Sequence, residues 1–533
     1  MTRSVVWVLM VGVLALPGSG IAANPRTTPS AEATATAGRI DRLLESAWAA
    51  KGIQPATRAD DAEFLRRVYL DLAGRVPSVS EVRAFLADKH DDKRRRLIAE
   101  LLERPTYSQH FTTVWRTLLM PEANSNFQTM FMVPGFEAWL RKQFDENVRY
   151  DAMVRELLTT TVGQDSMQSV YGRNANAKVT PIAFYMAKET KAENLASATA
   201  RVFLGIRLEC AQCHDHPFAE WKRDQFWSFA AFFGGMKSRD QGDGLRMPEA
   251  EKLNVWEIAI PGTNRQAPAT FPDGGKPDRT ATNTPRKSLA DWVTGAENPY
   301  FAKATVNRVW AYFFGKGLVE PIDEMVGSQE TVAHHAELLD ELARSFVSSG
   351  FNLKFLLETI VSTRAYQLTS GGGKSVTGEL YSRHPVRGLT AEQLFDSVAI
   401  ATGLGATDPQ GPINVFNNNS PRAEFVTKFG NQSERSTDHE TSILHALTLM
   451  NGKVIADATN PEKSQLLASV LDAPFFTTPT RIETFYLATL SRMPTAKELG
   501  RATMFVTSAP KPTEALADIL WSLLNSGEFL LNH

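Results

Sequence analysis

The chain's only two cysteines stand in one short segment, residues 208–221, which reads LECAQCHDHPFAEW. Two residues separate Cys210 from Cys213, and His214 follows directly. This is the C-x-x-C-H spacing by which c-type haem is attached. Thiols three positions apart on a helical turn face the same side, where each can add to one vinyl group of the porphyrin, and the next imidazole falls beneath the iron as proximal ligand. The motif therefore predicts a covalent haem c held by these three residues.

Three other interpretations of the same residues stay open. The two cysteines could form a single structural disulfide, which an oxidising compartment would allow. They could also work as a dithiol redox switch, although no strand of a βαβ unit precedes them. Finally, Cys210, Cys213, His214 and His216 could hold zinc, although four ligands within seven residues would crowd a tetrahedral site.

The sequence offers several candidates for the sixth position on a haem iron. Met247 precedes a proline in GDGLRMPEA, as the distal methionine of small cytochromes does, and a methionine ligand would raise the reduction potential. Met236, His439, His445 and an open position are its rivals. A closed site would suit electron transfer, whereas an open site would allow small-molecule or peroxide chemistry. No set of catalytic residues follows from the sequence, so it does not decide whether the protein is an enzyme.

Seven aromatic residues lie within sixteen positions after the motif: Phe218, Trp221, Phe226, Trp227, Phe229, Phe232 and Phe233. They are numerous enough to wall an apolar macrocycle. However, Phe226, Phe229 and Phe233 have helical spacing, and a stripe of this kind is more often core packing. Core packing is therefore the preferred interpretation.

The start of the chain predicts export. Arg3 is followed by an apolar run from Val5 to Pro17 and then by small residues, so residues 1–23 are expected to be a cleaved signal peptide. The apolar run is shorter than the ~20 residues that span a bilayer, and no later stretch reaches that length. The mature protein is therefore expected in the periplasm or another extracytoplasmic space, with no membrane span after signal cleavage.

Charge and composition limit the partners. The formal net charge is -2, so bulk electrostatics indicate no nucleic-acid partner and no acidic membrane surface. The basic run at residues 93–96 begins a helical pattern without interleaved aromatics, which favours a solvated helix face.

The periodicity of apolar residues predicts a mainly α-helical fold. After a disordered linker at 24–38, helical stripes recur at 40–48, 61–73, 79–88, 93–103, 136–146, 150–159 and 191–204. Residues 237–285 are rich in Gly, Pro, Asp and Asn, and only 255–260 (VWEIAI) has strand-like composition. We therefore expect two helical domains, 39–236 and 286–533, joined by an irregular connector at 237–285 with at most a small β element.

One sequence pattern occurs twice. YLDLAGRVPSVSEV (69–82) and YLATLSRMPTAKEL (486–499) share Tyr-Leu, an Arg two positions before Pro, and a Ser or Thr followed by Glu three positions later. The pattern predicts a helix, a turn and a second helix with a capping box, formed by Ser78 and Glu81 or by Thr495 and Glu498. A third box, Thr390 to Gln393, is expected to open another helix. These are structural features.

Other polar groups are weaker candidates for chemistry. His334 and His335 precede a helical pattern and are expected to be surface or capping residues rather than a metal pair. Residues 438–440 put a carboxylate beside an imidazole, but sequence neighbours need not face one another in the fold. Arg308 is predicted on a helix, where it is either structural or able to hold a haem propionate.

Several longer segments resemble a known family. CAQCHDHPF with the later FFGG, and residues 288–321, 335–370, 387–398 and 515–533, are similar to a two-domain family of secreted bacterial proteins of unknown function associated with planctomycete cytochrome C domains. The resemblance implies helical domains, export, and an electron-transfer link to a cytochrome-type redox partner. Many members carry a cytochrome domain ahead of these two, where this chain has only a signal and a short linker. The haem chemistry could therefore belong to this chain or to a partner.

Overall fold

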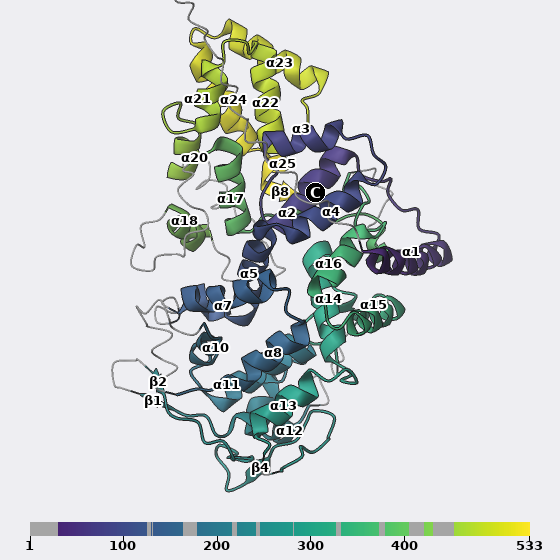
Figure 1. Ribbon diagram of the computed structural model, residues 1–533, viewed down its shortest axis with the longest axis vertical. Coiled ribbons are helices and arrows are strands. Elements are labelled where there is room, and N and C mark those ends of the chain that lie inside the picture. Colours follow the sequence, from purple (N-terminus) through teal and green to yellow (C-terminus); the bar gives the residue numbers. More distant parts are fainter. Residues whose placement is uncertain are drawn as a thin grey trace, which may run out of the picture.

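The computed structural model describes residues 30–124, 129, 132–163, 179–215, 221–240, 246–280, 282–326, 332–371, 379–404, 421–429 and 452–533. Its elements are mostly helices, which confirms the predicted fold class. In Figure 1, helices α20 to α24 lie at one end of the long axis, and α12, α13 and a short β-ribbon lie at the other.

The part of the chain before the connector is built from helices. Their bounds are α1 (Ala31–Lys51), α2 (Asp61–Ala73), α3 (Val79–Ala87), α4 (Lys93–Glu103), α5 (Pro105–Leu119), η1 (Pro121–Asn124), α7 (Val133–Asp145), α8 (Tyr150–Thr159), α10 (Ile182–Ala187), α11 (Ala192–Thr199), η2 (Ala200–Leu204), η3 (Glu209–Gln212), α12 (Arg223–Ala230) and η4 (Ala231–Phe233). Three of them, α2, α4 and α8, have the bounds that their apolar stripes predict. The element η2 is a π-helix, and η1, η3 and η4 are 3-10 helices.

Helix α1 begins earlier than expected. The Ser30 hydroxyl accepts a hydrogen bond from the N–H of Ala33, so the helix includes residues 31–38, for which disorder was expected. Ala33, Thr36 and Ala37 are buried, and α1 packs against α15 and α16. Burial of small side chains against these distant helices thus outweighs the polar, low-complexity character of the segment.

The connector contains two antiparallel ribbons. β1 (Ser238–Asp240) pairs with β2 (Arg246–Pro248), and β3 (Glu257–Ala259) pairs with β4 (Gln266–Pro268). The predicted strand-like segment at 255–260 contains β3, so a small β element here is confirmed.

Helices resume after the connector at α13, as the sequence predicts. The helices are α13 (Pro285–Val293), α14 (Phe301–Phe314), α15 (Ala336–Ser348), α16 (Leu353–Ser362), η5 (Glu379–Tyr381), α17 (Ala391–Thr402), α18 (Pro421–Phe429), α20 (Lys453–Ala458), α21 (Gln465–Asp472), α22 (Thr478–Leu490), α23 (Ala496–Ser508), α24 (Pro512–Leu524) and α25 (Gly527–Leu530). Two more ribbons pair β5 (Val319–Glu320) with β6 (Val332–Ala333), and β7 (Arg387–Gly388) with β8 (Leu531–Asn532).

The buried side chains form two hydrophobic clusters. The larger cluster runs from Ile40 to Tyr381, with Leu487 in addition, and includes side chains from both sides of the connector. The smaller cluster is built mainly from α17 to α25. Helix α2 contributes to both, with Val68 and Leu72 in the larger cluster and Leu70 in the smaller one. This helix therefore joins the two halves of the packing.

Charged side chains of α2 are buried at the same junction. Arg66 donates to the carbonyl oxygens of Thr489 and Phe529, at 2.8 and 2.7 Å. Arg67 donates to the carbonyl oxygens of Tyr366 and Leu368, at 2.5 and 2.9 Å. Because buried cations must be paired or hydrogen-bonded, these contacts are a condition of packing α2 in the centre of the molecule.

Asp71 is the acidic member of this buried group. Its carboxylate accepts hydrogen bonds from the Tyr366 hydroxyl at 2.7 Å, from the Arg387 guanidinium at 2.7 Å and from the Asn532 amide at 2.8 Å. One carboxylate thus connects α2 to three segments that lie about 300 to 460 positions later in the chain.

The repeated sequence pattern forms the same structure twice. Both copies contain a helix that ends in a left-handed residue, Gly74 (φ 69°) or Ser491 (φ 60°), followed by a second helix with a capping box. The third predicted box, Thr390 with Gln393, also forms. The first helix of the late copy, α22, contacts the second helix of the early copy, α3.

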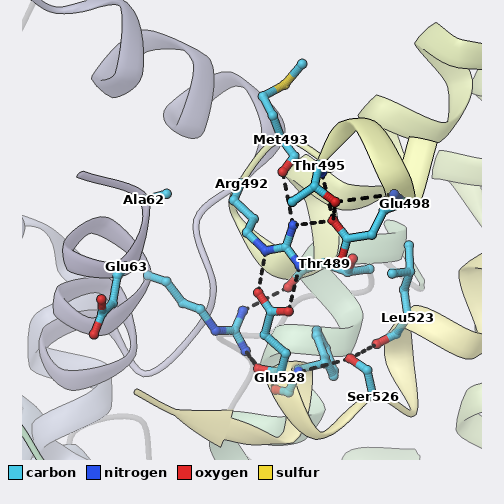
Figure 2. Close-up of polar contacts among 12 residues, drawn as sticks. Ala62, Glu63, Thr489, Arg492, Met493, Thr495, Glu498, Leu523, Ser526 and Glu528 are labelled. Atoms are coloured by element: carbon cyan, nitrogen blue, oxygen red, sulfur yellow. Dashed lines mark hydrogen bonds and ion pairs between the residues drawn. The ribbon is translucent and has the colours of Figure 1, made fainter. Parts of the chain in front are cut away.

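The two copies differ in the charges around the capping glutamate. In the late copy, Arg492 lies between Glu498 and Glu528 and donates to them at 2.9 and 2.6 Å (Figure 2). In the early copy the acid is in the middle, and Glu81 accepts from Arg75 at 3.0 Å and from Arg104 at 2.5 Å. The same turn is therefore stabilised by an arginine between two glutamates in the late copy and by a glutamate between two arginines in the early copy.

The basic run at 93–96 takes part in ion pairs within the chain. Lys93 and Arg94 pair with Asp61 at 2.5 and 2.8 Å, and Arg96 pairs with Asp88 at 2.7 Å. These ion pairs tie the start of α4 to neighbouring segments, and Arg94 is buried, whereas a solvated helix face was expected. Among the described residues, no helix combines the length and the apolar character that a membrane span requires.

Candidate functional site: the C-x-x-C-H turn

The motif lies on a surface turn between η2 and α12. Cys210 is in η3 and Cys213 directly follows it, and both are free thiols exposed to solvent. A 3-10 helix has three residues per turn, so residues three apart share one face. Leu208 and Ala211 are fully buried on the inner face, and the two cysteines share the outer face. The apolar anchors thus present both thiols to the same side.

The segment before the motif needs a glycine. Gly205 ends η2 with φ 63°, and a Cβ placed there would come within 2.9 Å of Met325 Sδ. The Met325 N–H donates to the Gly205 carbonyl oxygen at 2.8 Å. Met325 is thereby packed against the residue that ends η2, five positions before Cys210.

His214 is exposed, and its tautomer follows from one hydrogen bond. Its Nδ1 lies 2.7 Å from the Asp215 carbonyl oxygen. Because a carbonyl oxygen can only accept, Nδ1 must carry the proton, which leaves the Nε2 lone pair free. Metal-bound histidines commonly have this arrangement, with the second ring nitrogen donating to a backbone carbonyl.

The turn is also fastened to α12, the helix that follows it. The Trp227 indole N–H donates to the Gln212 carbonyl oxygen at 3.0 Å. The backbone N–H of Arg223 donates to Asp215 Oδ1 at 2.9 Å. Helix α12 thus contacts the turn at Gln212, which lies between the two cysteines, and at Asp215, which follows the histidine.

An ionic group lies beside the first cysteine. Glu209 approaches Arg201 at 4.0 Å, Arg201 approaches Asp323 at 3.7 Å, and Arg308 pairs with Asp323 at 2.5 Å. Burial raises the pKa of Glu209, although Arg201 and Arg207 act in the opposite direction. Arg308 was a candidate for binding a haem propionate, but its guanidinium is paired with Asp323 and also donates to the Arg201 carbonyl oxygen.

The described aromatic residues after the motif pack in the core, which is the interpretation that their helical spacing favours. The side chains of Phe226, Trp227, Phe229, Phe232 and Phe233 are buried in the larger cluster. Phe218 lies outside the described residues. The described aromatic stripe therefore supports the turn from beneath and does not wall an open cofactor site.

Of the four residues considered as a sixth ligand, only Met236 has a described side chain. Met247 lies in β2, where its backbone pairs with that of Arg239, and its side chain is outside the described part. Met236 is buried in the larger cluster. His439 and His445 lie outside the described residues, as do residues 438–440.

The described residues limit the zinc interpretation. Within these ranges, no three side chains of His, Cys, Asp or Glu are arranged to hold a metal ion. Cys210, Cys213 and His214 therefore do not converge on one point in the described turn, and His216 lies outside the described residues. His335, by contrast, has the predicted capping role, because its Nδ1 accepts from the Leu338 N–H at 3.3 Å.

The donor set fits haem attachment in three respects. Two free thiols are exposed on one face, the imidazole follows them, and its Nε2 is free. The sequence pattern identified these residues but missed Asp215, Trp227 and the Glu209–Arg201 contact. Two sequence features could have indicated them: Asp215 directly follows the motif, and Trp227 belongs to the group of aromatic residues after it.

Comparisons with known proteins identify two regions. PSCyt2, a protein of unknown function (DUF1549), matches residues 39–238, and PSD1, a protein of unknown function (DUF1553), matches residues 285–437. No curated protein and no solved structure matches the chain. The first match contains the whole C-x-x-C-H turn.

Proposed function

Because the chain belongs to the two-domain family of PSCyt2 and PSD1, associated with planctomycete cytochromes, we propose that it is an exported protein that attaches one haem c and takes part in electron transfer. The observation that carries the proposal is the geometry of the turn. Both thiols face solvent on one side, and the imidazole that follows them has a free Nε2.

Each residue of the motif has a defined role in this proposal. Cys210 and Cys213 would hold the haem by thioether bonds, and the Nε2 of His214 would be its protein ligand. A bound c-type haem would supply a one-electron iron couple. Leu208 and Ala211 keep the turn on the core, so that the thiols remain accessible. Met247 stays a proposed sixth ligand.

The proposed compartment and partner follow from the sequence. Thioether attachment takes place after export, so the signal-like residues 1–23 and the motif support one another. We expect the protein in the periplasm or another extracytoplasmic space. Its partner would be a second cytochrome-type protein, because the turn is open to solvent and can be approached directly.

Absorbance and intact mass test the proposal. The full chain is expressed with cytochrome c maturation machinery and purified from the host envelope. We expect a Soret band, a thioether-type pyridine haemochrome and a mass increase of one haem. Cys213→Ser should abolish normal two-thioether attachment, and Asp224→Asn, outside the motif, should leave it unchanged.

A second candidate belongs to another class: an envelope scaffold or binding protein whose motif is a disulfide or metal staple. The burial of the aromatic stripe favours it, because that stripe is part of the core rather than a cofactor wall. A colourless protein from its own host with two oxidised cysteines would overturn haem attachment and support this candidate.

A further inference from the structure

Asp215 connects the imidazole of the motif to the next helix. Its carbonyl oxygen accepts the hydrogen bond from His214 Nδ1 at 2.7 Å, and its carboxylate accepts from the backbone N–H of Arg223 at 2.9 Å. A single residue thus fixes the ring on one side and the start of α12 on the other.

The hydrogen bond from the Arg223 N–H to the Asp215 carboxylate gives a partner to a backbone N–H that has none within α12. The first N–H groups of a helix have no partner within the helix. The N-cap position of α12 is Lys222, whose ammonium group cannot accept a hydrogen bond. Asp215 therefore acts as the cap from outside the helix, and its negative charge suits the positive end of the helix dipole.

Trp227 provides a second anchor four residues further along α12. Its indole donates to the Gln212 carbonyl oxygen, and the side chain is buried. Helix α12 therefore holds the turn at two points, through the Trp227 side chain at Gln212 and through the Arg223 backbone N–H at Asp215. The Asp215 carbonyl is consequently held in place at the point where it meets the imidazole.

We infer that Asp215 is a positioning residue for His214: by capping α12 it holds its own carbonyl where it keeps the imidazole protonated at Nδ1 and leaves Nε2 free for a ligand. The role of Nε2 rests on the proposed function. The tautomer itself is a property of the chain and can be measured without haem.

Nitrogen NMR of the full apo chain labelled at histidine tests this inference, at a pH where the ring is neutral. The wild type should show His214 mainly as the Nδ1–H tautomer. Asp215→Ala should shift the population toward the Nε2–H tautomer that free histidine prefers. Asp215→Asn should retain the wild-type population, because an amide oxygen also caps a helix.

Asp224→Asn is the matched control, since Asp224 also lies in the first turn of α12 but pairs with Arg265. It should leave the tautomer unchanged. If Asp215→Ala keeps the wild-type tautomer while lowering stability, Asp215 is only a helix cap and the inference is overturned. A wild type without the Nδ1–H form also overturns it. A protein that never binds haem but gives the expected tautomers would overturn the proposed function alone.

Discussion

At the residue scale, equivalent positions in the repeated pattern carry different side chains. The left-handed C-cap is Gly74 in the early copy and Ser491 in the late copy. A left-handed conformation is strained for residues with a Cβ, and the buried Ser491 hydroxyl has no hydrogen-bond partner among the described residues. The late copy therefore uses a less favourable residue at the same place.

Ser491→Gly should stabilise the protein by about 0.5–1 kcal/mol, because it removes the strain and the unsatisfied hydroxyl. The free energy of unfolding, measured by chemical denaturation, checks this. Gly74→Ser is the reverse change and should be destabilising, since a Cβ at Gly74 would lie 2.4 Å from His110 Nδ1. A loss of stability in Ser491→Gly would contradict the explanation.

At the element scale, the capping glutamate of α23 has an unusual acidity. The hydrogen bond from Arg492, together with those from Thr495, lowers the pKa of Glu498 from its usual 4.5 to about 2. A carboxyl group whose pKa is lower in the folded state stabilises the fold above its unfolded pKa. This contribution is lost as the pH falls from about 4.5 toward 2.

Comparison of the wild type with Glu498→Gln should reveal this dependence. Near neutral pH the variant should be less stable, by about 1 kcal/mol or less, as is usual for partly exposed ion pairs. The difference should shrink as the pH falls from about 4.5 toward 2. Denaturation curves across this range provide the measurement, and a constant difference would show that the charge of Glu498 is not its cause.

Elements were predictable where their signals are local. The stripes of α2, α4 and α8 and the three capping boxes lie within a few residues, so the sequence alone predicts them. The early start of α1 depends on packing against α15 and α16, which no local pattern reveals. Likewise, the spacing alone identifies C-x-x-C-H, whereas the bond from Trp227 to Gln212 is a tertiary contact that no local pattern reveals.

At the scale of the whole molecule, α2 ties the two hydrophobic clusters together. Its apolar residues enter both clusters, and Asp71 binds Tyr366, Arg387 and Asn532. Loss of either cluster would therefore remove part of the packing or hydrogen bonding of the same helix. We expect both to unfold in one cooperative transition.

Asp71→Ala should lower the free energy of unfolding by about 3–5 kcal/mol, because it removes the carboxylate paired with the largely buried Arg387. Calorimetry and denaturant unfolding followed by two probes provide the measurement. The exposed Asp472 is a matched control, and Asp472→Ala should change stability by less than about 0.5 kcal/mol. Two separate transitions, only one of which shifts in Asp71→Ala, would contradict the coupling.

The central position of α2 also bears on how the chain matures. Arg66 finds its acceptors 423 and 463 positions later, so these bonds cannot form while the ribosome is still making the middle of the chain. The packing of α2 can therefore be completed only after the C-terminal residues Thr489 and Phe529 have been synthesised. For the export that we propose, this delay is useful, because a chain that has not yet completed its packing can be threaded through a translocon.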